Sequence, residues 1–174
     1  MERRERFECL YNAHASAVLA YLMRRTDPST ADELLAEVFA VCWRRIAEVP
    51  GDPLPWLFEV ARRVLSTHRR GNQRRAALQV RLRAITPERI EDPPAIVRES
   101  PLRRALDSLS DGDRELLMLV AWDGISPAQA AAALGVKPGT LRVRLARARS
   151  RLARQMDRTS DRTTTLHQQP MEMP

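Results

Sequence analysis

The stretch of residues 125–154 decides the fold, and it reads ISPAQAAAALGVKPGTLRVRLARARSRLAR. Ser126 is a favourable N-cap, and a proline follows it, so a short alanine-rich helix is predicted from Pro127 to Leu134. Gly135 then supplies a turn conformation that a residue with a Cβ resists. Pro138 opens a second, basic helix that runs to about the end of the stretch. The pattern is typical of a helix-turn-helix, whose second helix can enter the major groove of DNA.

The second helix of this stretch has distinct faces when its residues are laid out at about 100° per residue. One apolar stripe must face the rest of the domain and consists of Leu141, Leu145, Ala148 and Leu152. The opposite face carries short side chains, those of Gly139, Val143, Ala146 and Ser150. Arginines flank it, Arg142 and Arg149 on one edge and Arg144, Arg147 and Arg151 on the other.

This arrangement favours contact with DNA. Short side chains let a helix approach a groove wall closely, and arginines on both edges can reach phosphates or base edges. The alternative is a solvated cationic helix, or one that pairs with an acidic protein.

The composition indicates a helical protein with a polyanionic partner. Of 174 residues 44% are hydrophobic and only 5% aromatic, and the formal net charge is +7. Alanine, leucine, arginine and glutamate dominate, and no alternating strand pattern of useful length occurs. We therefore expect an all-α fold of two small helical domains joined by a flexible linker, the C-terminal one a helix-turn-helix.

The chain offers few patterns of ligand binding, catalysis or targeting. Cys9 and Cys42 lack a metal-ligand spacing and the three histidines are scattered, so no metal site and no disulfide framework are expected. We see no nucleophile–base pair and no phosphate loop, so no catalytic residue and no cofactor are expected. The chain has neither a signal-type leader nor a run of about 18 apolar residues, which predicts a cytoplasmic protein without membrane contact.

Three helices are expected in the N-terminal part. The first spans Arg3 to Arg25, and the second spans Ala31 to Val49 behind a capping box that starts at Thr30. Residues 50–55 contain three prolines and are expected to form a stiff loop that is not helical. Trp56 then begins the third helix.

The outer face of the third helix forms a second basic surface, with Arg62, Arg63, Ser66, Thr67, Arg69 and Arg70. The following segment is interrupted by prolines and nearly neutral, so it is expected to be a linker. The expected organisation is a first domain over 1–76, a linker over 77–100, a second domain over 101–156 and a disordered tail over 157–174.

Four stretches together resemble the bacterial RNA polymerase sigma factors of the extracytoplasmic-function group. They are ADELLAEVF (Ala31 to Phe39), PWLFEVARRVLSTHRR (Pro55 to Arg70), LSDGDRELLMLVAWDGIS (Leu109 to Ser126) and the helix-turn-helix itself. They occur in the family's order and cover most of residues 7–154. The resemblance implies a dissociable subunit that lends promoter specificity and strand capture to the polymerase, which performs the chemistry.

The resemblance also implies partners and contact residues. Core RNA polymerase would be bound at its β′ clamp helices, through Asp32, Glu33, Leu34, Glu37, Val38 and Phe39, and at its β flap. The unpaired strand of the −10 element would be held by Trp56, Arg62, Arg63, Ser66, Thr67, Arg69 and Arg70. The −35 duplex would be read by Lys137, Thr140, Arg142, Val143, Arg144 and Arg147. An anti-sigma protein is a further implied partner.

Two alternatives remain open from the residues alone. The chain could be a stand-alone helix-turn-helix regulator that acts as a dimer through its N-terminal helices. The segment from Ala31 to Phe39 and the second basic surface distinguish the two hypotheses, because a simple dimeric regulator needs neither. For Trp56, a role as a core anchor is the alternative to stacking on a base.

Overall fold

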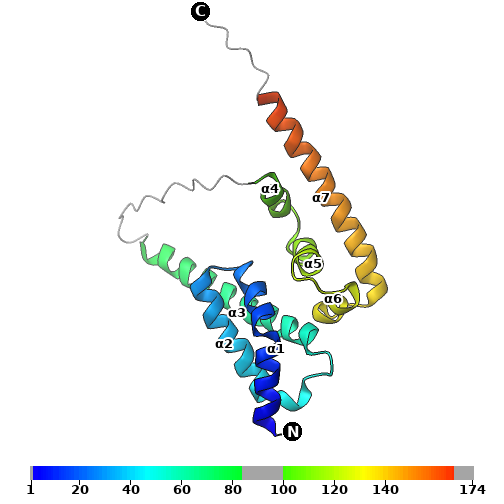
Figure 1. Ribbon diagram of the computed structural model, residues 1–174. Coiled ribbons are helices and arrows are strands. Elements are labelled where there is room, and N and C mark those ends of the chain that lie inside the picture. The colour runs from blue at the N-terminus through cyan, green and yellow to red at the C-terminus, as the bar shows by residue number, and fades with distance from the viewer. Residues whose placement is uncertain (1, 84–99, 167–174) are drawn as a thin grey trace, which may run out of the picture. The chain divides into compact units, whose positions relative to one another are not determined.

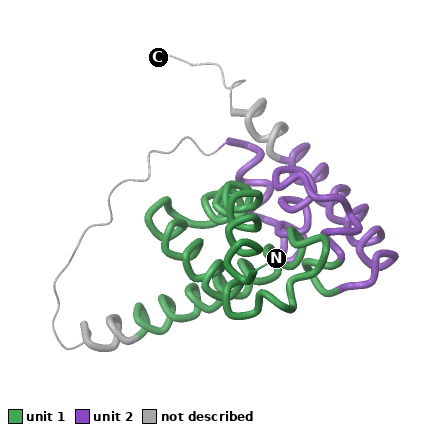
Figure 2. Tube along the Cα trace, turned by 60° about the horizontal axis from the view of Figure 1, so that its bottom comes forward, with its two compact units in different colours: residues 1–93, 132–135 green, residues 94–131, 136–174 purple. Residues whose placement is uncertain are grey.

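The structure is a computed structural model that describes residues 2–83 and 100–166, leaving out the side chains of 78–83 and 159–166. The described residues form seven α-helices and one 3-10 helix without any strand, which confirms the all-α expectation. The chain divides into two compact units, residues 1–93 with 132–135 and residues 94–131 with 136–174 (Figure 2). The expected linker lies for the most part outside the described residues.

The first unit is built from α1 (Arg3–Met23), α2 (Pro28–Arg44), the 3-10 helix η1 (Ile46–Glu48) and α3 (Pro53–Arg83) (Figure 1). The three α-helices pack against one another. Tyr21 of α1 lies stacked on Phe58 of α3 with ring centroids 5.0 Å apart, and both side chains are buried. Aliphatic side chains complete this core, among them Val18, Leu22, Leu34, Val38 and Leu57.

Two helices of the first unit begin earlier than the sequence predicted. The carboxylate of Asp27 accepts a hydrogen bond of 3.0 Å from the backbone N–H of Thr30, so α2 begins at Pro28 and the capping box expected at Thr30 is wrong. The same bond lowers the pKa of Asp27. α3 begins at Pro53, inside the loop expected to be non-helical. A first turn tolerates proline, because its N–H groups have no intrahelical partner in any case.

Arginine side chains bind the carbonyl groups that the ends of the first unit's elements leave unpaired. α2 ends at Arg44 and not at Val49, where its end was expected from the sequence. The 3-10 helix η1 occupies the residues in between. The last carbonyls of a helix have no intrahelical donor, and a guanidinium can supply one. Three such bonds bridge distant parts of the chain: Arg3 to the carbonyl of Trp43 (2.7 Å), Arg6 to that of Val49 (2.7 Å) and Arg69 to that of Arg25 (2.9 Å).

The other four helices are α4 (Pro101–Asp107), α5 (Asp111–Ala121), α6 (Pro127–Leu134) and α7 (Pro138–Leu166). α4 and α5 pack against α7. Serine caps begin the first two of these helices: the hydroxyl of Ser100 accepts from the N–H of Arg103 (3.2 Å) and that of Ser110 from the N–H of Asp113 (3.3 Å).

The helix-turn-helix has the local geometry that its sequence predicts. Ser126 and Gln129 form a reciprocal capping box, with hydrogen bonds of 3.2 Å and 3.0 Å between each side chain and the other's N–H. Gly135 ends α6 with φ of +65°, in the left-handed region. The N–H of Val136 then bonds the carbonyl of Ala131 at 3.0 Å, which closes the helix end.

Helix α7 continues past the expected end of the second domain at Met156. It runs to Leu166, so the expectation of a structureless tail from residue 157 is wrong for its first ten residues, and 167–174 lie outside the described part. The sequence lost its apolar periodicity there, but periodicity reports burial rather than helix formation. No glycine or proline occurs between Gly139 and Pro170, so nothing in this segment breaks the helix.

We predict opposite effects of two glycine substitutions that lie four residues apart. Gly135→Ala places a Cβ in the left-handed region and should lower the free energy of unfolding by about 1–2 kcal/mol. Gly139→Ala lies in α7 with no atom within 4 Å of the new Cβ, and should raise it by about 0.5–1 kcal/mol. Thermal unfolding followed by circular dichroism measures both; effects of equal sign would contradict the turn geometry.

Candidate nucleic-acid interface

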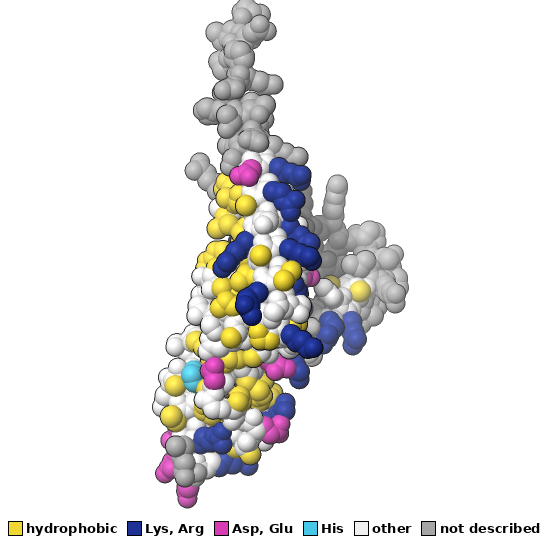
Figure 3. All heavy atoms as spheres, turned by 90° about the vertical axis from the view of Figure 1, so that its right-hand side faces the viewer, with side chains coloured by type: hydrophobic (Ala, Val, Ile, Leu, Met, Phe, Trp, Pro, Cys, Tyr) yellow, Lys and Arg dark blue, Asp and Glu magenta, His cyan; other side chains and the backbone are white. Residues whose placement is uncertain are grey.

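The rotation of α7 follows from its buried apolar stripe. Leu141, Leu145 and Ala148 are at most 5% exposed, and Leu152 is half-buried. The short side chains predicted for the opposite face are all exposed, namely Gly139, Val143, Ala146 and Ser150. Figure 3 shows basic side chains beside hydrophobic ones on the face of the molecule that it draws. The exposed face of α7 therefore has the shape and charge that the helical layout predicts.

The candidate −35 residues fall into two groups by exposure. Lys137, Thr140, Arg142, Val143 and Arg147 are exposed, and the first two lie at the N-terminus of α7, where anions are favoured. Arg144 is half-buried, and one of its Nη atoms lies 3.0 Å from where a Cβ on Gly112 would be. Arg142, Arg144 and Arg147 make no hydrogen bond or ion pair within the described part of the chain.

Arg151 has a different role from the one its position on the helix predicted. The sequence placed it on the edge of the DNA-facing surface with Arg144 and Arg147. In the structure it forms an ion pair with Asp113 of α5, whose side chain is buried. The partner lies 38 residues away in the sequence, so no local pattern could have indicated it.

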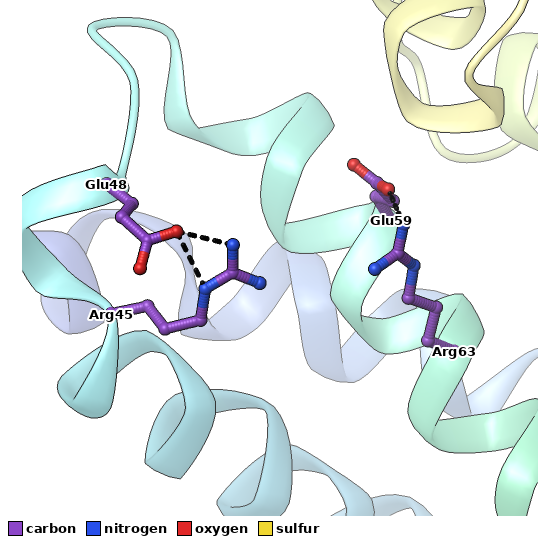
Figure 4. Close-up of polar contacts among 4 residues, drawn as sticks. All are labelled: Arg45, Glu48, Glu59 and Arg63. Carbon is purple, nitrogen blue, oxygen red and sulfur yellow. Dashed lines mark hydrogen bonds and ion pairs between the residues drawn. The ribbon is translucent and has the colours of Figure 1, made fainter.

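The candidate −10 residues all lie on α3, and several of their side chains already have partners in the protein. Arg63 forms an ion pair with Glu59 one turn earlier (Figure 4), and Arg70 donates to the hydroxyl of Thr67 at 3.3 Å. Arg69 binds the end of α1, as described above. Arg62 is half-buried, and its Nε has no hydrogen-bond partner in the described structure. Ser66 is half-buried and Thr67 exposed.

Arg45, which the sequence did not single out, lies beside Trp56 at this end of the unit. Trp56 is half-buried in the first turns of α3, and the guanidinium of Arg45 lies 5.8 Å from the centroid of its ring. Glu48 accepts a hydrogen bond of 3.0 Å from Nε of Arg45 (Figure 4), and this bond lowers the pKa of Glu48. Arg45 follows directly on α2, a position without a pattern of its own.

The predicted polymerase-docking residues of α2 separate into exposed and buried sets. Asp32, Glu33 and Glu37 are exposed. The apolar members Leu34, Val38 and Phe39 are at most 3% exposed and belong to the core of the first unit. Leu34 and Val38 therefore face the core rather than a partner, whereas the edge of Phe39 also lines a surface groove. Their spacing puts them on the helix side that packs on α1 and α3.

A groove between α1 and α2 was not predicted from the sequence. It is lined by Arg4, Phe7, Glu8, Ala36, Phe39, Ala40 and Trp43. The rings of Phe7 and Trp43 contact each other across it, with centroids 5.3 Å apart, and Tyr11 beside the groove lies against Phe39 with centroids 4.8 Å apart. Tyr11 and Trp43 are 41% and 39% exposed. The signal that could have revealed it is a pair of aromatic residues one turn apart on each helix.

The described residues contain neither a membrane-spanning helix nor a metal-binding cluster. Among the described helices, none combines the length and the hydropathy that a membrane span requires. Within the same residues, no group of three or more histidine, cysteine, aspartate or glutamate side chains is arranged to hold a metal ion.

Comparison with known proteins identifies the family. Sigma-70 region 2 matches residues 10–75, and sigma-70 region 4 matches residues 100–152. The ECF RNA polymerase sigma factor SigL of Mycobacterium tuberculosis is 31% identical over 143 residues, which are 78% of this chain and 80% of that protein. The ECF sigma factor EcfG of Rhodopseudomonas palustris is 34% identical over 128 residues, covering 71% and 69%. The chain belongs to the extracytoplasmic-function sigma factors of RNA polymerase.

Solved structures show the same fold at lower identity. The sigma factor RpoE of Bartonella quintana, solved in complex with the anti-sigma factor NepR, superposes with a TM-score of 0.64 at 23% identity and covers 87% of this chain and 96% of that one. CnrH, solved with the cytosolic domain of CnrY, gives a TM-score of 0.54 at 23% identity, covering 87% of each chain.

We predict that substitutions of two adjacent residues of α2 change the free energy of unfolding by very different amounts. Leu34→Ala removes a buried side chain and should lower the free energy of unfolding by about 2–5 kcal/mol. Glu33→Ala changes an exposed side chain and should stay within about 0.5 kcal/mol of the wild type. Urea denaturation provides the measurement. Equal losses in the two variants would mean that α2 is not oriented as described.

Proposed function

We propose that this sigma factor binds core RNA polymerase through α2, captures the melted non-template strand of the −10 element with α3, and reads the −35 duplex with α7. The exposed face of α7 carries the proposal, because it combines short side chains with arginines that have no partner in the described structure. The protein acts in the cytoplasm with the polymerase and performs no catalysis itself.

The −35 contacts follow from the position of each side chain on α7. Lys137 and Thr140 hold phosphates at the helix N-terminus, where the helix dipole favours anions. Arg142, Arg144 and Arg147 extend from the two edges toward base edges, and the arginine fork matches the acceptors of guanine. Val143, which is 52% exposed, supplies an apolar contact of the kind made to a thymine methyl group.

The −10 contacts rest on the outer face of α3 and on Trp56. Unpaired bases bind by stacking, and cations follow the backbone. Trp56 has an incompletely buried ring for stacking, and Arg62, Arg63, Arg69 and Arg70 supply the cations, with Ser66 and Thr67 as hydroxyl donors. Incoming phosphates compete with Glu59 for Arg63, and such exposed ion pairs contribute only about 0–1 kcal/mol.

The polymerase contact rests on the acidic outer face of α2 and on the adjoining aromatic groove. Asp32, Glu33 and Glu37 present carboxylates to the β′ clamp helices, and the second domain contacts the β flap. Uncovered apolar surface is uncommon on a protein that works alone. We also propose that an anti-sigma factor occupies these surfaces when the protein is inactive. The structural neighbour RpoE was solved in complex with an anti-sigma factor, NepR.

The test is transcription of total genomic DNA by purified core polymerase with and without this chain, with the 5′ ends of the products mapped. The expected result is a set of start sites that share −10 and −35 elements and depend on the chain. Gel filtration of the chain with core polymerase should in addition show co-elution. Start sites that do not change on its addition, together with duplex binding by a free dimer, would favour a stand-alone regulator and contradict the proposal.

A charge-matched pair of variants tests the recognition helix. Arg147→Ala should weaken binding of the cognate −35 duplex by about 1–3 kcal/mol and relax specificity at one base pair. Arg154→Ala removes the same charge two turns further along α7, where its Nε is bonded to the carbonyl of Ser150, and should leave base preference unchanged. Fluorescence anisotropy against single-base variants of the element measures both. Identical base preference in the two variants would mean that Arg147 does not contact a base of the −35 element.

A further inference from the structure

The first turn of α5 contacts the recognition helix through two consecutive residues. Asp113 forms an ion pair with Arg151 of α7. Its neighbour Gly112 lies beside Arg144, whose Nη is 3.0 Å from where a Cβ on the glycine would be. Arg144 and Arg151 are two helical turns apart, about 10 Å along the axis. The first turn of α5 therefore lies against α7 at two points along the axis of α7, at Arg144 and at Arg151.

Because Asp113 is buried, breaking its ion pair with Arg151 costs more free energy than breaking an exposed pair. The residue is 6% exposed, and an unpaired buried carboxylate costs several kcal/mol, so Asp113 retains its guanidinium partner. The hydroxyl of Ser110 accepts from the N–H of Asp113 at 3.3 Å, which fixes the turn that carries the carboxylate. Asp113 also lies at the N-terminus of α5, where the helix dipole favours a negative charge.

The pair supplies a directional constraint that the apolar contact of α7 cannot. Burial of Leu141, Leu145 and Ala148 selects the buried side of the helix, but the hydrophobic effect is non-directional and tolerates small rotations and shifts. A charge-assisted hydrogen bond from a guanidinium depends on distance and angle. A pair of this kind restricts the rotation and height of a helix further, within the side that aliphatic packing selects.

We propose that Asp113 is a positioning residue for promoter recognition: through Arg151 it sets the rotation and height of α7, and with them the places where Arg142 and Arg147 meet the base edges. The proposal rests on the proposed reading of the −35 element by α7. Asp113 touches no DNA, and Arg151, which the helical layout placed among the DNA-facing arginines, serves to hold the helix.

A matched pair of substitutions in the same turn tests this. Asp113→Asn removes the ion pair, and Asp111→Asn makes the same charge change in an exposed residue two positions earlier. Holoenzyme reconstituted with the full chain is assayed for binding to a promoter with its cognate −35 element and to the same promoter with that element scrambled. The ratio of the two affinities is the discrimination, and thermal unfolding is followed in parallel.

We expect Asp113→Asn to lower the discrimination about tenfold, the equivalent of one base contact, by weakening cognate binding while affinity for the scrambled promoter is kept or raised. Unfolding alone would weaken both. Asp111→Asn should stay within about twofold of the wild type. If the wild type discriminates and Asp113→Asn discriminates equally well, the positioning role is overturned while the proposed function stands. A wild type without discrimination would overturn the proposed function as well.

Arg151→Lys provides a second variant should Asp113→Asn unfold at the assay temperature. It keeps both charges and the pairing of Asp113, but replaces a planar fork by a flexible ammonium group. A reduced discrimination with an unfolding temperature close to that of the wild type supports positioning. Unchanged discrimination in this variant would overturn it.

Discussion

The burial of one narrow stripe of α7 is the constraint on which the proposed promoter recognition depends. Leu141, Leu145 and Ala148 are held against the helices that precede them, and this fixes which side of α7 meets solvent. With a period of about 3.6 residues, the opposite side can then only be the one with Gly139 and Val143. Removing apolar area from water supplies the free energy, and the helix geometry converts it into an orientation for the arginines.

Arginine serves two purposes in this chain, and the net charge of +7 does not separate them. Some guanidinium groups complete the fold: Arg3, Arg6 and Arg69 bind carbonyls at the ends of elements, and Arg114 binds those of Leu106 and Asp107 in the last turn of α4. Others, such as Arg142 and Arg147, have no partner in the described structure. The second group forms the candidate interface, so fewer cations are available to DNA than composition suggests.

Local signals made the second domain predictable. The Ser110 cap, the Ser126 and Gln129 capping box and the left-handed Gly135 each act within one turn of helix, so a few neighbouring residues determine them. Helix starts were predicted less well. Asp27, directly before Pro28, caps α2 in place of Thr30, and Pro53 opens α3 in a segment whose prolines indicate a loop. The end of α7 was missed because helix propensity persists after burial ends.

Long-range partners account for most of what the sequence could not give at the candidate sites. The face of α2 that carries Leu34 and Phe39 is apolar whether it meets a core or a partner protein, and only the packing of α1 and α3 assigns it to the core. The aromatic groove requires Phe7 and Trp43 to meet across two helices. Arg151 looks like its neighbours on α7 until Asp113 is brought beside it.

The most direct measurement of the central claim is site-specific crosslinking in one promoter complex. A photoreactive amino acid is placed at position 147 or at position 63 of the chain in reconstituted holoenzyme, and the crosslinked nucleotides are mapped. We predict crosslinks from position 147 to duplex bases of the −35 element and from position 63 to the unpaired non-template strand at −10. Crosslinks from position 147 that fall at no fixed promoter position, or on protein alone, would contradict the assignment of α7 as the promoter-reading helix.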